Sequence, residues 1–189
     1  MEKGTWEYKA FISYRHNSFD RKVAVKLQKM LETFHIPKKF SGEKQWKVFR
    51  DETELPTSDD LSQGIKEALE KSEFLIVICS ETTKESRWCR QEMAYFKSLH
   101  NNTTKKILTV LISGDPSEVF PEEICWTEEI VTDFAGNKVT VKAEVEPLAA
   151  NIVAGSERDS FKKLKGEFLR IAAPLLGISY DALKQRQRT

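Results

Sequence analysis

The continuous apolar segment Phe74–Cys79 is the sequence feature that most constrains the fold. It is the longest unbroken apolar run in the chain, with the six residues Phe-Leu-Ile-Val-Ile-Cys. A short run of this kind is typical of a central strand in a parallel sheet, which other elements cover on both faces. It is far shorter than the roughly 20 apolar residues that a membrane-spanning helix needs. The run therefore predicts a buried strand and no membrane span.

Three further segments have the composition of strands. They are rich in β-branched and aromatic side chains and are bounded by polar residues. These segments are Lys9–Tyr14, Trp46–Phe49 and Ile107–Ile112. Together with the central run, they predict a sheet of at least four strands.

Helix-like patterns fill the intervals between these strands. The first helix is predicted to begin at Ser18 or Asp20. The second is predicted to have its N-cap at Thr57 or Ser58, and the third to span residues 86 to about 100. Strands and helices therefore alternate along the chain, which is the pattern of an α/β protein with an open parallel sheet and helices on both faces.

Residues 113–155 are less regular and suggest an insertion. Gly136-Asn137 lies between two β-prone stretches, Ile130–Thr132 and Val139–Val141. A Gly-Asn pair between such stretches is typical of a hairpin turn. We therefore predict a hairpin insertion, followed by another strand or extended segment near Leu148–Val153.

The end of the chain has helical periodicity again. A long helix is predicted over the apolar repeat from Phe161 to Ala172, broken near Pro174 and Gly177, and a short polar helix follows from Ser179. The predicted organisation is one domain over residues 1–178, with the insertion at about 113–155, and a polar C-terminal extension or linker at 179–189.

Composition narrows the possible partners and the cellular location. Thirty Lys and Arg residues stand against 29 Asp and Glu residues, so the chain has no global basic excess for binding nucleic acid. The N-terminal residues 1–7 show no apolar stretch of a secretory signal, which predicts a cytoplasmic protein. Cys79, Cys89 and Cys125 are odd in number and widely spaced, as expected of reduced structural thiols.

Several functions common on α/β sheets lack their motifs here. No GxGxxG follows the first predicted strand and no Walker A lysine is present, which excludes dehydrogenases and P-loop NTPases. A phosphoacceptor receiver domain needs acidic residues at strand ends, but these strands end in Tyr14-Arg15 and Cys79-Ser80. His16, His35 and His100 have no metal-ligand spacing, so no metal is expected.

Glu92 is the most unusual charged residue in the predicted third helix. Its neighbours one turn away on either side are Trp88, Cys89, Tyr95 and Phe96, so no basic residue of its own helix can pair with it. A carboxylate beside an aromatic wall is typical of a functional cleft. A glutamate at the edge of a helix's apolar face can equally reach out to water, so the pattern leaves both interpretations open.

Four segments, in order and in spacing, resemble a bacterial TIR (Toll/interleukin-1 receptor) domain. They are Tyr8–Tyr14, Phe49–Pro56, Ala68–Ser80 and Ser86–Glu92. The resemblance covers roughly residues 5–125 and implies a flavodoxin-like sheet of order 2-1-3-4-5. It also implies that residues 50–57 form the loop that this family uses for self-association and for gating its active site.

The resemblance further implies an activity. Many TIR domains cleave NAD+ at the nicotinamide glycosidic bond, and Trp88 and Glu92 match the motif that carries their catalytic glutamate. NAD+ would be the substrate and no cofactor would be needed. The product would be ADP-ribose or a cyclic isomer, and the setting would be bacterial immunity, such as antiphage defence, or signalling.

Further site residues follow from the same resemblance, each with a structural alternative. The expected substrate-binding residues are Trp88, Phe11, Ser13, Tyr14, Arg15 and Arg50, and the expected interaction-loop residues are Asp51, Glu52, Leu55 and Pro56. Phe11 can instead be a core residue, and Ser13 a buried hydroxyl at a strand end. Arg15 can brace the loop after the first strand, and Arg50 can pair with neighbouring acids.

The near-neutral total charge hides a segregation of charge along the chain. Residues 1–40 contain nine Lys or Arg against four Asp or Glu, whereas residues 50–60 contain Arg50 against five acids. Opposite patches suit head-to-tail self-association into an oligomer or filament, although both can be ordinary solvated faces.

Three functional classes therefore remain. The first is an NAD+ hydrolase that is active when protomers assemble. The second is a non-catalytic TIR adaptor that acts through contacts with other TIR domains. The third, more remote, is a nucleoside N-glycosidase or deoxyribosyltransferase. The pair Trp88 and Glu92 favours the first class, since an adaptor has no need of it.

Overall fold

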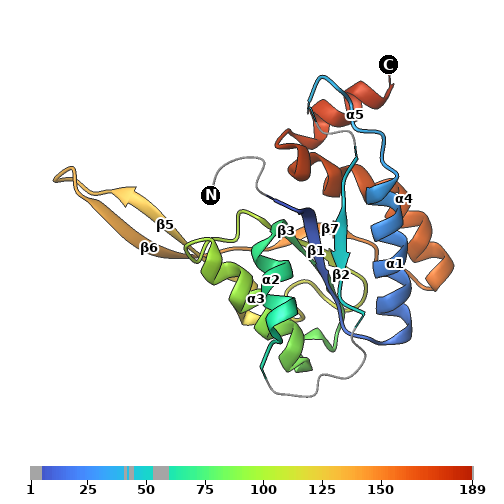
Figure 1. Ribbon diagram of the computed structural model, residues 1–189, viewed down its shortest axis with the longest axis horizontal. Coiled ribbons are helices and arrows are strands. Elements are labelled where there is room, and N and C mark those ends of the chain that lie inside the picture. Colours follow the sequence, from blue (N-terminus) through green and yellow to red (C-terminus); the bar gives the residue numbers. More distant parts are fainter. Residues whose placement is uncertain (1–5, 41, 43–44, 53–59, 189) are drawn as a thin grey trace.

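A five-stranded parallel sheet forms the centre of the molecule. The computed structural model describes residues 6–40, 42, 45–52 and 60–188. The sheet has the order β2-β1-β3-β4-β7, which confirms the predicted order 2-1-3-4-5 with β7 as the fifth strand of the sheet (Figure 1). Its strands are β1 (Tyr8–Ser13), β2 (Val48–Arg50), β3 (Ser72–Cys79), β4 (Ile107–Leu111) and β7 (Leu148–Asn151).

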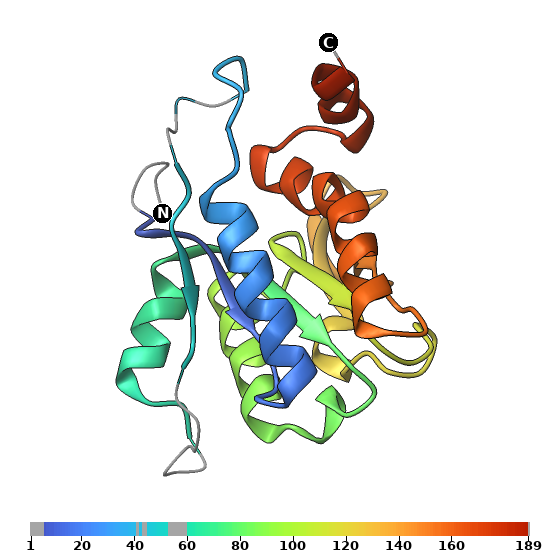
Figure 2. The same cartoon turned by 90° about the vertical axis from the view of Figure 1, so that its right-hand side faces the viewer.

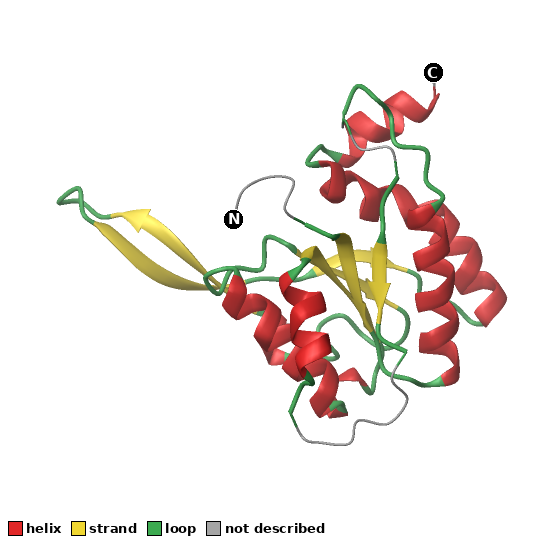
Figure 3. Cartoon of the chain, in the orientation of Figure 1, coloured by secondary structure: helices red, strands yellow, loops and turns green. Residues whose placement is uncertain are grey.

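Helices cover both faces of this sheet, as predicted. Helices α1 (Ser18–Glu32) and α4 (Glu157–Leu176) pack on one face, and α2 (Gln63–Glu70) and α3 (Arg87–Leu99) pack on the other (Figures 2 and 3). Two short 3-10 turns are also present: η1 (Thr83–Glu85) precedes α3, and η2 (Glu122–Ile124) follows β4.

The central strand β3 supplies side chains to both cores. Ile76 and Ile78 belong to the core beneath α1 and α4, whereas Leu75 and Val77 belong to the core beneath α2 and α3. All four are at most 1% exposed. Each buried side chain of this size contributes about 1.5–3 kcal/mol of transfer free energy, which explains why this strand has no polar face.

The predicted start of the second helix is wrong. Helix α2 begins at Gln63, because the side chain of Ser62 caps it by accepting a hydrogen bond from the Ile65 amide at 3.2 Å. The predicted caps Thr57 and Ser58 lie outside the described residues.

The predicted end of the long helix near Pro174 and Gly177 is confirmed, and it falls at Gly177. Pro174 lies inside α4, and the helix continues to Leu176 and ends at Gly177, whose φ of +71° favours glycine. A proline in the last turn disturbs few of the hydrogen bonds of a long helix, so the glycine and not the proline determines the end.

The predicted hairpin insertion is confirmed. Strands β5 (Trp126–Thr132) and β6 (Lys138–Glu144) form a separate two-stranded antiparallel sheet that projects away from the domain (Figure 1). Gly136 in the connecting turn has a φ of +83°. The hairpin lies between β4 and β7 in the sequence, yet these two strands still pair directly in the five-stranded sheet.

The C-terminal segment forms a polar helix, α5 (Tyr180–Arg188), as predicted from Ser179 onward. Its Leu183 is fully buried in the same core as α1 and α4. Among the helices of the described residues, none combines the length and the apolar character needed to cross a bilayer.

Candidate active site

Glu92 lies on α3 at the end of the sheet where the parallel strands finish. The side chain of Ser86 caps α3 by accepting from the Cys89 amide at 3.2 Å. One turn later, Glu92 is only 1% exposed, and its Oε1 atom accepts a hydrogen bond of 2.8 Å from the hydroxyl of Ser13. Because Ser13 is the last residue of β1, this bond joins the helix directly to the end of a central strand.

The protonation of Glu92 is strongly perturbed by this environment. Burial, the largest cause, raises the pKa of the carboxyl well above its usual range. The hydrogen bond from Ser13 lowers this pKa, and the nearby charge of Asp51 raises it. Within the described part of the chain, Glu92 Oε2 has no hydrogen-bond partner. A buried carboxyl with one free oxygen is typical of a group that receives a ligand.

Trp88 connects the start of α3 to the segment that follows β2. Its indole Nε1 donates a hydrogen bond of 3.2 Å to Oδ2 of Asp51, which is itself buried. Trp88 lies one helical turn before Glu92, so Asp51 is drawn close to that carboxylate. This arrangement explains why the charge of Asp51 raises the pKa of Glu92.

Tyr14 and Arg50 hold the backbone of the same segment. The Tyr14 hydroxyl donates to the carbonyl of Asp51 at 2.7 Å and accepts from Nη1 of Arg50 at 3.0 Å. Arg50 also donates to Oε1 of Gln28 at 2.9 Å and pairs with Glu52 at 2.8 Å. The structural alternative given above for Arg50, pairing with a neighbouring acid, is therefore present in this conformation.

Arg15 and Phe11 also occupy the positions of their structural alternatives. Arg15 donates to the carbonyl of Thr82 at 2.8 Å and pairs with Glu85 at 3.3 Å, so it braces the loop after β1 against the segment after β3. The ring of Phe11 has no exposed surface and stacks on Phe49 with 5.1 Å between ring centroids. Their contacts with substrate stay predictions.

The structure thus brings four of the predicted residues together from separate segments. Ser13, Asp51, Trp88 and Glu92 form one connected group, which we call the Glu92 cluster. Leu55 and Pro56 lie outside the described residues. Because Ser13, Asp51 and Glu92 are each at most 4% exposed, a ligand could reach the carboxylate only after surrounding side chains move.

Asp20 is a residue that the sequence analysis missed. It lies in the first turn of α1, is 4% exposed, and its Oδ2 has no hydrogen-bond partner among the described residues. Burial raises its pKa to about 6, opposed in part by a hydrogen bond from Ser80 and by the charge of Arg15. Its position in the sequence could have indicated this site, because the start of α1 follows β1 and lies at the same end of the sheet as Ser13.

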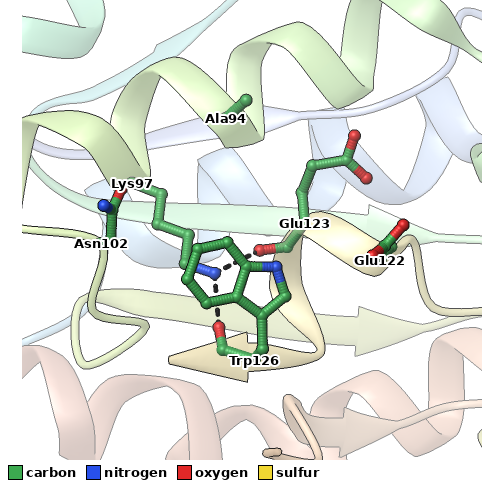
Figure 4. Close-up of a pocket in the computed structure, with 6 residues that line it drawn as sticks. All are labelled: Ala94, Lys97, Asn102, Glu122, Glu123 and Trp126. Atoms are coloured by element: carbon green, nitrogen blue, oxygen red, sulfur yellow. Dashed lines mark hydrogen bonds between the residues drawn. The ribbon is translucent and has the colours of Figure 1, made fainter. Parts of the chain in front are cut away.

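Lys97 marks a second polar site, farther along α3. Its ammonium group donates to the carbonyls of Glu123, at 2.9 Å, and of Trp126, and it lies 3.1 Å from the centroid of the Trp126 ring (Figure 4). Burial lowers its pKa to about 8. These residues border a pocket of about 240 Å³ at the base of the hairpin, where Lys97 fixes the start of β5 to α3.

Comparison with known families gives a match over most of the chain. The family model described as the TIR domain matches residues 10–135. This range contains β1 from Ala10 onward, β2 to β5, and the whole Glu92 cluster.

Two curated relatives and one solved structure are also similar to the chain. The NAD(+) hydrolase ApTIR of Actinoplanes sp. is 34% identical over 108 residues, covering 57% of this chain and 14% of that protein. The TMV resistance protein N of Nicotiana glutinosa is 24% identical over 157 residues, covering 83% of this chain and 12% of that protein. The TIR domains of the activated Roq1 resistosome, which directly recognises the pathogen effector XopQ, align with a TM-score of 0.47 and 24% identity, covering 59% of this chain and 61% of that chain.

Proposed function

The chain belongs to the TIR domain family, and from this premise we propose that it hydrolyses NAD+ at the nicotinamide glycosidic bond. The observation that carries the proposal is the buried carboxyl of Glu92, held by Ser13 and bordered by Trp88. The similarity to the NAD(+) hydrolase ApTIR supports it. The chain spans only 14% of the length of one curated relative and 12% of the other, so the activity of this chain is a proposal and not a finding.

One carboxylate is chemically sufficient for this reaction. Nicotinamide is joined to the ribose as a pyridinium cation, so when the glycosidic bond breaks, both electrons go to the ring nitrogen and nicotinamide leaves neutral. No general acid is required, whereas ordinary O-glycosidases use two carboxyl groups. Water then adds to the ribose C1′ and gives up a proton, and the products are nicotinamide and ADP-ribose.

Glu92 has an electrostatic role in this scheme. Its ionised form stabilises the positive charge that develops on the ribose as nicotinamide departs. Although burial favours the neutral form in the empty site, the positive pyridinium of NAD+ and the hydrogen bond from Ser13 both favour the carboxylate. Substrate binding therefore promotes the ionisation that catalysis needs.

Other residues of the site are assigned to substrate binding. Trp88 is half-buried beside Glu92, where its ring can stack on nicotinamide. Tyr14, Arg50, Arg15 and Phe11 complete the proposed binding set once the site has opened, with the arginines facing the pyrophosphate. NAD+ serves as substrate without any cofactor.

The proposal extends to product, assembly and location. A ribose hydroxyl of the same molecule can replace water and give a cyclic isomer of ADP-ribose. Self-association with other TIR domains activates the enzyme, and Asp51 and Glu52 belong to the loop that mediates it. The free thiols of Cys79, Cys89 and Cys125 fit a cytoplasmic location.

Release of nicotinamide from NAD+ tests the activity. The wild-type chain at high concentration is compared with Glu92→Gln, which keeps the size and the acceptor for Ser13 but cannot ionise. Glu167→Gln is the matched control, because Glu167 lies on α4, which packs on the other face of the sheet from α3. We expect Glu92→Gln to lose about a hundredfold or more in rate and Glu167→Gln to remain as active as wild type.

Two results would contradict the proposal. Wild type that releases no nicotinamide at any concentration would favour a non-catalytic adaptor, and Glu92→Gln that releases nicotinamide as fast as wild type would show that Glu92 is not the catalytic group. An adaptor would still bind other TIR domains, so an inactive wild type that sediments as an oligomer would support that class.

A further inference from the structure

The hairpin formed by β5 and β6 is left without a covering element. Among the described residues its two strands pair only with each other, and every β6 residue except Ala143 is exposed. An isolated two-stranded hairpin is at best marginally stable in water, and a third strand or a packed face is needed for independent stability. The hairpin is therefore an incomplete sheet.

The strand pairing defines two different faces on this hairpin. Opposed residues share a face, and Val131 is opposed to Val139 while Glu129 is opposed to Val141. Val131, Val139 and Val141 therefore lie on one face, each 38–39% exposed. The opposite face carries the charged residues of β6, Lys138, Lys142 and Glu144, together with Trp126, over whose ring Lys142 lies at 4.4 Å.

The two edges of the hairpin differ. The outer edge of β5 is partly satisfied, because the Glu128 amide donates to the carbonyl of Asn102 at 3.0 Å. In β6, residues whose main-chain groups bond to β5 alternate with residues whose amides and carbonyls point outward. The Val145 amide donates to Cys125 and the Asp133 amide donates to Asn137, and these two bonds show which residues of β6 belong to each set. The outward residues are Lys138, Thr140, Lys142 and Glu144, and among the described residues their outer edge has no partner.

We propose that β6 pairs antiparallel with β6 of a second copy of this chain, around a two-fold axis through Val141. The two hairpins then form one four-stranded sheet of order β5-β6-β6-β5, a self-complementary contact. This interface does not depend on the hydrolysis of NAD+, and it differs from head-to-tail contact between the oppositely charged N-terminal and loop segments.

Charge selects this register over its neighbours. With the axis through Val141, Lys138 faces Glu144 of the second copy at both ends of the ladder, and Thr140 faces Lys142 of the second copy. With the axis through Thr140, Lys138 would face Lys142, and with the axis through Lys142, two lysines would face each other. Like charges directly opposed are destabilising, and lysines on an edge guard against unwanted pairing. The favoured register also uses all seven residues of β6.

Apolar contacts agree with the same register. Val141 faces its own copy, and Val139 faces Ala143 of the second copy, in the closely spaced pairs that lack main-chain bonds between them. The turn that carries the fully exposed Phe134 is brought toward residues 145–148 of the second copy. That segment includes Pro147 and borders a pocket of about 360 Å³, large enough to receive a side chain.

Charge reversal across the interface tests the register directly. Sedimentation equilibrium of the full chain is measured for wild type, Lys138→Glu, Glu144→Lys and the double variant. Each single change places like charges opposite each other at both ends, so we expect the dimer dissociation constant to rise about tenfold or more. The double variant reverses both partners of each pair and should dimerise as wild type does, and an equimolar mixture of the two single variants should form heterodimers.

A proline pair tests the role of the β6 edge. Thr140→Pro removes an outward amide from β6, whereas Ile130→Pro removes the outward amide of the opposed residue on β5. We expect only Thr140→Pro to abolish dimers. Circular dichroism of both variants checks that the domain remains folded.

The outcomes separate this interface from its rivals. A wild type that stays monomeric at every concentration, or a Lys138→Glu variant that dimerises as well as or better than wild type, overturns the proposed interface. Glu92→Gln should dimerise as wild type does whether or not wild type hydrolyses NAD+, so failure of the enzymatic proposal leaves this one intact.

Discussion

The hydroxyl of Ser13 donates a 2.8 Å hydrogen bond to Glu92, a residue 79 positions away in the sequence. Both side chains are 1% exposed. This bond lowers the pKa of the glutamate, in opposition to burial and to Asp51. Ser13 therefore favours the ionised form that the proposed reaction requires.

Removal of this hydroxyl should change the pH dependence of hydrolysis. In Ser13→Ala, the pKa of Glu92 rises further, so the acid limb of the kcat/KM profile moves to higher pH. At neutral pH we expect kcat/KM to fall about tenfold, the loss of one modest hydrogen bond to a charged group. Ser13→Thr, which keeps a hydroxyl, is the control. An unchanged limb in Ser13→Ala would show that the hydroxyl does not set the ionisation of Glu92.

The bond from Trp88 to Asp51 can be separated from the aromatic surface of Trp88. Trp88→Phe keeps a ring but loses the Nε1 donor, and leaves the buried Asp51 short of one partner. We expect about 1–2 kcal/mol lower unfolding free energy, with most nicotinamide release retained. Trp88→Ala should also lose at least about tenfold in rate. Chemical denaturation and initial rates measure both quantities, and equal rates for Phe and Ala would argue against stacking.

Asp20 should make the stability of the fold depend on pH. Its pKa is raised from 3.8 to about 6 in the folded protein, so between these values the folded state holds a proton that the unfolded state has lost. The unfolding free energy should therefore fall as the pH rises from about 4 to about 6. Asp20→Asn removes this pH dependence. The unfolding free energy of Asp20→Asn minus that of wild type should therefore be about 1–3 kcal/mol larger above pH 6 than at pH 4. Parallel pH curves for the two proteins would contradict the expectation.

Two glycines with similar backbone angles should respond differently to substitution. Gly114 and Gly136 have φ of +86° and +83°, so alanine is strained at both. At Gly114 the added Cβ would also lie 2.5 Å from Val119 Cγ1, whereas at Gly136 nothing lies within 4 Å. We expect Gly136→Ala to lose about 1 kcal/mol of unfolding free energy and Gly114→Ala about 1–3 kcal/mol more. Thermal unfolding of the pair checks this, and equal losses would rule out the clash.

The strands of the sheet could be predicted from the sequence because buried strands have a recognisable apolar composition. Phe74–Cys79 has no polar face, and a strand without a polar face has to lie at the centre. The start of α2 could not be predicted, since Thr57, Ser58 and Ser62 are all suitable caps and only tertiary packing selects Ser62. The end of α4 was predictable from Gly177, whereas Pro174 is accommodated within the last turn of the helix.

The site was only partly predictable. The isolation of Glu92 from basic residues was visible in helical spacing, but its burial was not, since the same pattern fits a glutamate that reaches out to water. The roles of Ser13 and Asp51 were not visible, since both depend on contacts between residues far apart in sequence. Asp20 was missed because an acid in the first turn of a helix is ordinarily explained by the helix dipole alone.

Helix α3 carries Glu92 near its middle and Lys97 one and a half turns later. Through Lys97 the helix is bonded to the carbonyls from which the hairpin starts. The same helix therefore anchors both the base of the hairpin and the acidic side chain of the candidate site.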